Sequence, residues 1–191
     1  MSRPAVFLDR DGTIIEERGY LDRLEDLTIF PWTGDALRLL KRAGFATVVI
    51  TNQSAIARGL IDEAFLSRVH QTIDSRVNAA GGGIDRYYFC PHFPEATIER
   101  YRQTCGCRKP APGMIEQACR EMDLDASRSV MVGDRWLDVA CGRAAGTRTV
   151  LVRSGHGSSE AETTPPAGVH ADAILNNLME AVGWILRSSS R

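Results

Sequence analysis

The chain has 191 residues, of which 43% are apolar and 25% are charged, and its formal net charge is −1. This length suits one domain spanning residues 1–191, and the near-neutral charge gives no reason to expect nucleic acid or an anionic membrane as a partner. The apolar runs are too short to span a bilayer, and the N-terminal run lacks the length and cleavage site of a signal peptide. We therefore expect a cytoplasmic protein.

Apolar, β-branched runs alternate along the chain with stretches of helical periodicity. In chain order these predict a strand at residues 5–9, a helix at 34–43, a strand at 45–51, a long helix capped by Asp62, a strand at 84–90, a helix at 112–122, a strand at 129–134, a helix at 137–145, strands at 147–152 and 171–175, and a helix at 178–186. The long helix should bury four side chains spaced four apart, namely Phe65, Val69, Ile73 and Val77. Residues 154–168, rich in Gly, Ser, Thr, Glu and Pro, should form a surface loop.

Strict alternation of strand and helix indicates a parallel α/β sheet with helices on both faces. In such sheets, ligands bind at the carboxyl ends of the strands. Polar residues with a role in binding should therefore gather at these ends. Four of the predicted strands end in candidate site residues, which are Asp9, Thr51, Cys90 and Asp134.

Asp9 and Asp11 form the first candidate pair. Residues two apart on an extended chain point to the same side, so both carboxylates should face one pocket. One can attack phosphorus as a nucleophile, while the other protonates the leaving oxygen and later deprotonates water. The alternative is a polar strand end followed by an Asp-Gly turn, and the strictly apolar strand before the pair weakens that alternative.

Two further segments could bind a phosphoryl group. Thr51-Asn52-Gln53-Ser54 offers a hydroxyl and free backbone N–H groups, which can hold phosphate oxygens. Lys109 could neutralise both the nucleophilic carboxylate and the phosphoryl group, and the planar fork of Arg108 could grip a phosphate. Taken alone, the first segment also suits a turn and the second a solvated basic pair.

Acidic residues after the fourth strand suit a hard cation. Asp134 follows Gly133 at the end of an apolar strand, and Asp138 comes one helical turn later. Mg²⁺ prefers oxygen ligands from a few carboxylates, with water and phosphate completing its shell. For Asp138 an equally good interpretation is a first-turn acid that interacts with the helix dipole.

Three of the five cysteines cluster with a histidine, giving the set Cys90, His92, Cys105 and Cys107. In a reducing compartment such a cluster favours a metal over disulfides, and three thiolates with one imidazole are a usual structural zinc set that leaves no open position for catalysis. The alternative is buried unpaired cysteines beside a surface histidine. Cys119 and Cys141 fall within predicted helices and should act as small buried hydrophobic residues.

The four motifs, in this order over residues 5–153, resemble those of the haloacid dehalogenase superfamily of phosphotransferases. The resemblance implies Asp9 as nucleophile and Asp11 as general acid/base, with Thr51 and Lys109 stabilising the phosphoryl group. It implies Mg²⁺ held by Asp9, the backbone carbonyl of Asp11, and Asp134. It also implies a three-layer Rossmann-like fold with the strand order 5-4-1-2-3.

The resemblance is closer for one branch of the superfamily. Segments 7–13, 51–54, 57–59, 107–110 and 132–134 resemble the D-glycero-D-manno-heptose 1,7-bisphosphate 7-phosphatases, which share their pattern with histidinol-phosphate phosphatases. That branch has a zinc-binding loop at the place of residues 90–107, with ligands matching Cys90, His92, Cys105 and Cys107. Two positions depart from the pattern: Ala55 stands where Gly is usual, and Arg135 stands where Lys is frequent. If the first position needed a positive φ, alanine would cost about 1 kcal/mol.

The short distances between motifs leave no room for a cap domain, so the pocket should be open. Three loops, residues 12–32, 52–61 and 90–108, should then set selectivity. The resemblance places substrate contacts at Arg108, at Arg135 and in residues 17–20. The full expected set is Arg18, Gly19, Tyr20, Asn52, Gln53, Ser54, Arg58, Arg108 and Arg135, although Arg18 and Arg58 also suit a solvated surface.

These observations predict a monomeric, Mg²⁺-dependent phosphatase with a structural Zn²⁺ and a small phosphorylated sugar as substrate. The leading reaction is removal of the 7-phosphate of D-glycero-D-manno-heptose 1,7-bisphosphate, a step that would supply precursors of lipopolysaccharide. The alternatives within the superfamily are a histidinol-phosphate phosphatase or another small sugar-phosphate phosphatase. A non-catalytic, zinc-stabilised binding module is a different class of function, and the intact set of catalytic positions speaks against it.

Overall fold

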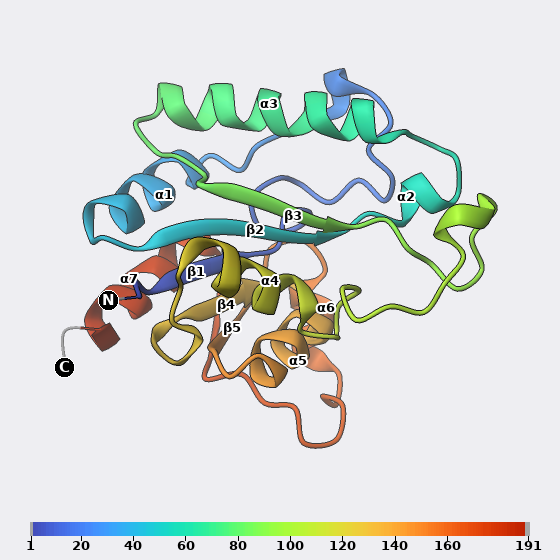
Figure 1. The fold of residues 1–191 in the computed structure, drawn as a ribbon. Helices are drawn as coiled ribbons and strands as arrows, with labels where there is room; N and C mark the ends of the chain where they lie inside the picture. The colour runs from blue at the N-terminus through green and yellow to red at the C-terminus, as the bar shows by residue number, and fades with distance from the viewer. Residues whose placement is uncertain (1, 190–191) are drawn as a thin grey trace.

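Among residues 2–189, which the structure describes, a six-stranded sheet in the order β3-β2-β1-β4-β5-β6 forms the centre of the computed structural model (Figure 1). Every neighbouring pair of strands is parallel. The predicted order of the first five strands is confirmed, and the predicted strand at 171–175 extends the sheet beside β5. The strands are β1 (Ala5–Leu8), β2 (Ala46–Asn52), β3 (Arg86–Cys90), β4 (Val130–Gly133), β5 (Arg148–Val152) and β6 (Ala173–Leu175).

Helices cover both faces of the sheet and give the three layers that were predicted. Helices α1, α3 and α7 share one core cluster, while α4 and α5 contribute to the cluster on the opposite face. None of the described helices is both long enough and apolar enough to cross a membrane. The helices are α1 (Thr33–Arg42), α2 (Ser54–Ala57), α3 (Glu63–Ala79), α4 (Gly113–Met122), α5 (Trp136–Ala144), α6 (Gly157–Glu162) and α7 (Leu178–Ser189).

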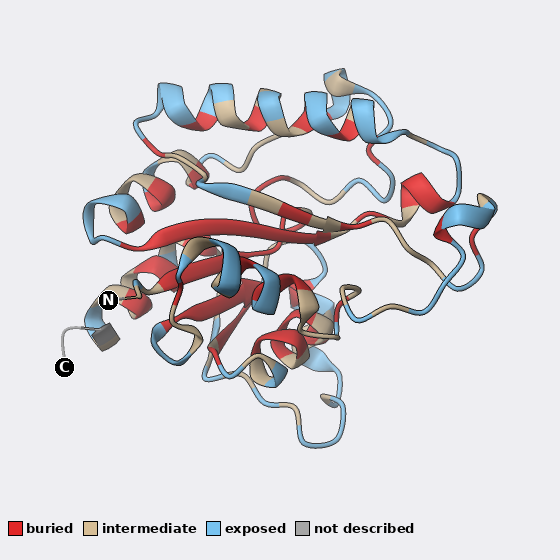
Figure 2. Cartoon of the chain, viewed as in Figure 1, coloured by how far each residue is buried: buried red, intermediate tan, exposed pale blue. Residues whose placement is uncertain are grey.

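Strand β1 shows how the sequence specifies these layers. Val6 and Leu8 pack into the core cluster that contains α1, α3 and α7, whereas Ala5 and Phe7 pack into the cluster that contains α4. Side chains alternate between the faces of a strand, so a strand covered on both faces is apolar at every position. All four residues are fully buried, which makes β1 a rigid support for the residues that follow it (Figure 2).

Helix α3 differs in one detail from the prediction. Asp62 is its N-cap, with Oδ1 accepting a hydrogen bond of 2.6 Å from the backbone of Phe65, and Val69, Ile73 and Val77 are buried as expected. Phe65, however, is half-buried, and Leu66 takes the buried place one turn before Val69. The reason is that a strict four-residue spacing drifts around a helix of 3.6 residues per turn.

Two other local expectations need correction. Residues 154–168 are not a loop throughout, because α6 forms within them and Glu160 accepts hydrogen bonds from both the backbone and the indole of Trp136. Ala55 lies in α2 with an ordinary φ, since Asp123 is the one non-glycine residue with a positive φ in the described part of the chain. The departure at Ala55 therefore introduces no backbone strain.

The connections that border the carboxyl end of the sheet hold no inserted cap domain among residues 2–189. Between β1 and α1 the chain forms a loop with one short 3₁₀ turn at Leu24–Asp26. Between β2 and β3 lie only α2 and α3, and β3 leads to a loop with a second 3₁₀ turn at Glu99–Tyr101. The pocket between these loops is open, as the spacing of the motifs predicted.

Candidate active site

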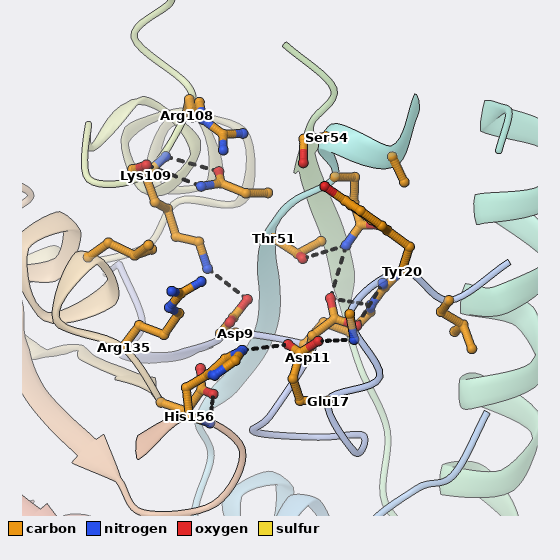
Figure 3. Close-up of a pocket in the computed structure, with 18 residues that line it drawn as sticks. Asp9, Asp11, Glu17, Tyr20, Thr51, Ser54, Arg108, Lys109, Arg135 and His156 are labelled. Carbon is orange, nitrogen blue, oxygen red and sulfur yellow. Dashed lines mark hydrogen bonds and ion pairs between the residues drawn. The ribbon is translucent and has the colours of Figure 1, made fainter. Parts of the chain in front are cut away.

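A pocket of about 370 Å³ lies where the carboxyl ends of β1, β2 and β4 meet (Figure 3). Most of the residues expected in the site line it, but Arg18 and Arg58 do not. The lining from the expected set is Asp9, Asp11, Gly19, Tyr20, Thr51, Asn52, Gln53, Ser54, Arg108, Lys109, Asp134 and Arg135, and the other lining residues are Arg10, Glu17, Leu21, Ala55, Leu137 and His156.

Lys109 is the centre of charge in the pocket. Its Nζ lies 2.7 Å from Oδ1 of Asp9 and 2.6 Å from Oδ1 of Asp138, and it donates a third bond of 3.0 Å to the carbonyl of Ile50. Its side chain is 1% exposed, so these groups replace water almost entirely. Burial alone would lower the pKa of Lys109, but the two carboxylates outweigh burial and raise it. The lysine is therefore a fixed positive charge beside Asp9.

The acidic residues carry more charge than this lysine can balance. Asp9, Asp134 and Asp138 are all buried, and one carboxylate oxygen of each lies within 4.8 Å of the other two. Burial and the neighbouring carboxylates raise the pKa of Asp134, and burial raises that of Asp9 although Lys109 opposes it. Three carboxylates against one ammonium group leave an excess charge that a divalent cation would balance.

Asp134 has the free ligand atom that such a cation requires. Its Oδ2 accepts a hydrogen bond of 2.7 Å from the backbone of His156, whereas Oδ1 is buried without a hydrogen-bond partner among residues 2–189. A buried polar atom without a partner is costly, and oxygen ligands of this kind suit Mg²⁺. The residues present thus fit the predicted magnesium site.

Asp138 has the first-turn position that the sequence suggested, and it also belongs to the carboxylate cluster of the pocket. As a residue in the first turn of α5 it accepts a hydrogen bond of 3.1 Å at Oδ2 from the backbone of Arg135. Its other oxygen pairs with Lys109 and belongs to the carboxylate cluster. Asp138 therefore links the start of α5 to the charge balance of the pocket.

Asp11 is held differently from Asp9. The guanidinium of Arg10 contacts both of its oxygens, at 3.1 Å from Nε and 2.9 Å from Nη2, and Gln53 donates a further bond of 3.1 Å to Oδ2. Arg10 is 3% exposed, so its guanidinium is shielded from water, whereas Asp11 is 22% exposed and remains accessible from the pocket. Gln53 also donates to the hydroxyl of Thr51 at 2.9 Å and so ties the second motif to the first.

Asn52 acts on the backbone of the third motif. Its side-chain amide donates to the carbonyl of Lys109 at 3.1 Å and accepts from the backbone N–H of Lys109 at 3.0 Å. The amide group lies in the pocket wall, and these two bonds fix the main chain from which the lysine side chain extends. Asn52 was expected among the substrate contacts, and its bonds to the main chain of Lys109 were not predicted, since residues 52 and 109 are distant in sequence.

The expected substrate-binding arginines lie in three settings. Arg108 lines the pocket and donates a bond of 3.2 Å to the carbonyl of His92, and Arg135 lines it with its Nε 3.5 Å from Glu160. Arg18 is half exposed and pairs with Glu16 at 2.7 Å, outside the lining. Arg58 is exposed and packs against the rings of Tyr20 and Phe93 beside the pocket.

Some lining residues, Arg10 and His156 among them, were not anticipated, whereas Glu17 belongs to the loop 17–20 in which substrate contacts were expected. Arg10 stands between two acids directly after an apolar strand, and that position was a usable signal that its charge would be buried and paired. Glu17 and His156 face each other at 3.7 Å across the pocket wall, from loops more than a hundred residues apart (Figure 3). No local pattern marks that second contact, because only the fold brings the two loops together.

The cysteine cluster is assembled as the sequence suggested. Sulfur atoms of Cys90, Cys105 and Cys107 lie 3.1 to 3.5 Å apart, and Nδ1 of His92 lies 3.4 Å from Cys107 and 3.8 Å from Cys90. Zinc bound tetrahedrally at about 2.3 Å would separate its sulfur ligands by roughly 3.8 Å, so a small outward shift would fit it. The four donors could hold a metal ion. Outside the cluster, Cys141 is fully buried and Cys119 is half-buried.

Comparison with known proteins identifies the family. A family model described as "HAD-hyrolase-like" matches residues 106–181. The chain is 42% identical over 180 residues to the D-glycero-beta-D-manno-heptose-1,7-bisphosphate 7-phosphatase of Escherichia coli (strain K12), covering 94% of this chain and 92% of that protein. It is 38% identical to the protein of the same name from Haemophilus ducreyi, covering 97% of this chain and 100% of that one. The chain belongs to this family of the haloacid dehalogenase superfamily.

Solved structures within this family have the same fold. The D,D-heptose 1.7-bisphosphate phosphatase from B. bronchiseptica, complexed with magnesium and phosphate, matches with a TM-score of 0.85 at 29% identity over 97% of this chain and 99% of that one. The protein of that name from Burkholderia thailandensis matches with a TM-score of 0.69 at 27% identity over 99% of this chain and 100% of that one. The predicted superfamily and branch are thereby confirmed.

Proposed function

We propose that this chain hydrolyses the 7-phosphate of D-glycero-D-manno-heptose 1,7-bisphosphate through an aspartyl-phosphate on Asp9. The observation that carries the proposal is the buried ion pair of Asp9 and Lys109 at the base of an open pocket, in a chain 42% identical to the Escherichia coli phosphatase over 94% of its length. The curated relatives are named for the β anomer of the substrate. Lipopolysaccharide precursor synthesis is the process that this reaction would serve.

The geometry supports a role for each of the four residues proposed as catalytic. Lys109 binds Oδ1 of Asp9, which leaves Oδ2 to attack phosphorus and form the Asp9–phosphorus bond. Asp11 protonates the departing sugar oxygen, and it then takes a proton from the water that hydrolyses the aspartyl-phosphate. Lys109 and the hydroxyl of Thr51 stabilise the charge that develops on the phosphoryl oxygens.

We propose Asp9, Asp134 and the backbone carbonyl of Asp11 as the magnesium ligands. The orphaned Oδ1 of Asp134 and the excess of carboxylates support this assignment. Bound Mg²⁺ would neutralise phosphate charge and orient the phosphoryl group for attack. A structural Zn²⁺ would be held by Cys90, His92, Cys105 and Cys107. Because Arg108 and Lys109 directly follow Cys107 in the chain, this metal would also support the pocket.

Phosphate release from the purified protein tests the function directly. We expect kcat/KM for the heptose bisphosphate to exceed that for histidinol phosphate by at least tenfold, and a preference for histidinol phosphate would contradict the assignment.

Asp9→Asn should remove turnover while the protein remains folded, because it deletes the nucleophile. Turnover retained by that variant would exclude the covalent route.

We further propose that residues 1–191 act as a single-domain, cytoplasmic monomer. The continuous sheet and the lack of an inserted domain among residues 2–189 support the single domain. Light scattering with size-exclusion chromatography tests the monomer, and a mass near twice 21.0 kDa would contradict it. Fractionation of the source cells tests the location.

A further inference from the structure

Two aromatic rings and two guanidinium groups alternate along one side of the pocket. We call this set, which consists of Tyr20, Arg58, Phe93 and Arg108 in that order, the rim ladder. The guanidinium carbon of Arg58 lies 5.9 Å from the ring centre of Tyr20 and 4.5 Å from that of Phe93, and the guanidinium carbon of Arg108 lies 5.2 Å from Phe93. A cation within about 6 Å of a ring centre is attracted by the face of the ring.

The rim ladder connects the three loops that border the pocket. Tyr20 comes from the loop after β1, Arg58 directly follows α2, and Phe93 and Arg108 come from the segment after β3. Both ends of the ladder, Tyr20 and Arg108, line the pocket (Figure 3). Phe93 is the one member of the ladder that contacts both guanidinium groups, so it links Arg58 to Arg108.

The two arginines of the ladder differ in their charge balance from the other cations of the site. Arg10 pairs with Asp11, Lys109 pairs with Asp9 and Asp138, and Arg135 lies near Glu160. By contrast, within residues 2–189 no carboxylate lies at ion-pair distance from the guanidinium of Arg58 or of Arg108. The single hydrogen bond of the Arg108 side chain goes to the neutral carbonyl of His92.

Two unpaired positive charges against one ring form a site for an anion. The two guanidinium carbons lie 4.5 Å and 5.2 Å from the same ring centre, so they are at most 9.7 Å apart, and small rotations of these long side chains would let one phosphate contact both. Guanidinium groups bind phosphate with two parallel hydrogen bonds, and an anion between them would also relieve their mutual repulsion. Packing on a ring fixes side chains in advance, which reduces the entropy lost on binding.

We propose that Phe93 is a positioning residue, which holds Arg58 and Arg108 as a clamp for the second phosphate of a bisphosphate substrate. The phosphate to be hydrolysed lies at Asp9, and the clamp at the rim holds the phosphate that is retained. This inference rests on the proposed function, because it requires a substrate with two phosphate groups. The clamp should therefore contribute to the binding of a bisphosphate. It should not contribute to the binding of a monophosphate, which has no second phosphate group.

Phe93→Leu tests the proposal, since leucine keeps an apolar side chain but removes the ring. The measured quantity is the ratio of kcat/KM for the heptose bisphosphate to kcat/KM for p-nitrophenyl phosphate. Loss of two cation–ring contacts should lower this ratio about tenfold, mainly through KM for the bisphosphate. Phe93→Tyr keeps a ring and should restore most of the ratio. An unchanged ratio in Phe93→Leu, or an equal loss in Phe93→Tyr, would overturn the proposal.

A matched control exists on α3. Phe65 is a half-buried phenylalanine whose ring has Arg68 5.4 Å from its centre, and it lies outside the pocket lining. Phe65→Leu should therefore leave the substrate ratio unchanged, even if it lowers the melting temperature. A drop in the ratio equal to that of Phe93→Leu would show that loss of any such ring produces the effect, and it would contradict a specific clamp.

Phe93 is also expected to act through the arginines. In an Arg58→Gln/Arg108→Gln background, Phe93→Leu should cause less than a twofold further loss of the substrate ratio, whereas an undiminished tenfold loss would exclude the positioning role.

A binding measurement separates this inference from the proposed function. Inhibition of p-nitrophenyl phosphate hydrolysis by fructose 1,6-bisphosphate should exceed that by fructose 6-phosphate, and Phe93→Leu should reduce the difference. If the heptose bisphosphate is not hydrolysed but this difference behaves as expected, only the proposed substrate fails.

Discussion

At the residue scale, the site depends on positions where no side chain fits. Gly12 has φ +78°, and a Cβ added to it would lie 2.1 Å from Oδ2 of Asp134. Gly155 has φ +57°, and its added Cβ would lie 2.3 Å from the same atom. The two loops close around Asp134 from opposite ends of the chain, and this packing leaves Oδ1 of Asp134 as the free ligand atom.

Gly12→Ala should therefore act on the metal site. The added methyl group must displace the Asp134 carboxylate, so the Mg²⁺ concentration for half-maximal activity should rise at least tenfold. Gly44→Ala is the matched control, because Gly44 has a similar φ of +82° with no heavy atom within 4 Å of an added Cβ. It should cost about 1 kcal/mol of stability through backbone strain alone and leave Mg²⁺ activation unchanged. Equal Mg²⁺ activation in both variants would contradict this account of Asp134.

Arg10→Lys tests how Asp11 is held. Lysine preserves the positive charge but lacks the planar fork that donates two parallel hydrogen bonds from separate nitrogens, and a lost charge-assisted hydrogen bond costs about 1.5–3 kcal/mol. We expect kcat to fall at least tenfold with little change in KM, because the role proposed for Asp11 is to transfer protons and not to bind the substrate. Steady-state kinetics on a variant checked by circular dichroism provide the measurement. A rise in KM at constant kcat would show that Arg10 serves binding instead.

At the element scale, α3 and β3 are joined by a partly buried polar contact. The ring of His70 stacks on that of Tyr87 at 4.1 Å, and the Tyr87 hydroxyl donates a bond of 2.8 Å to Asp74. Nε2 of His70 is buried without a partner in the described part of the chain. Burial lowers the pKa of His70 to about 3, with a further contribution from the nearby charge of Arg10. His70 is thus neutral in the folded protein near pH 7.

This contact predicts a pH dependence of stability. The folded-state pKa of about 3 lies below the usual value of 6.5, so the unfolded chain binds one more proton between these values. The contribution of His70 to stability is complete above pH 6.5. It is lost as the pH falls, by up to about 1.4 kcal/mol per pH unit. In His70→Phe the free energy of unfolding should fall less steeply from pH 6.5 to pH 4. The free energy of unfolding of both proteins is measured by urea denaturation at several pH values. The same slope of this free energy against pH in both proteins would contradict the role of His70.

At the scale of the whole molecule, the cysteine cluster fixes a long connection to the sheet. Cys90 ends β3, and Cys107 lies two residues before Lys109, so one metal ion would close the loop between them. Restricting a long loop stabilises the folded state, and a metal that binds only the folded state adds its binding free energy. The pocket and the cluster are therefore coupled through the chain rather than through a shared ligand.

Cys107→Ser should lower the melting temperature. A loss of about 3 kcal/mol corresponds to roughly 6–12 °C for a domain of this size. Turnover per folded molecule should still depend on Mg²⁺, since the proposed magnesium ligands are separate residues. Cys119→Ser, a half-buried cysteine outside the cluster, is the control and should shift the melting temperature by far less. Identical melting of the two variants, measured by calorimetry with metal analysis, would contradict a structural zinc site.

The sequence by itself determined the layers and the position of the site, and its resemblance to the superfamily added the strand order. Strands buried on both faces must be apolar throughout, and their ends must then carry the polar chemistry, which is why Asp9, Thr51 and Asp134 were recognisable as strand-end residues. Only the tertiary structure decided what those residues touch. Three contacts join segments far apart in the chain: the two hydrogen bonds from the Asn52 side chain to the main chain of Lys109, the ion pair of Lys109 with Asp138, and the rim ladder. Local patterns cannot encode such contacts, because they arise from the packing of separate loops around a shared pocket.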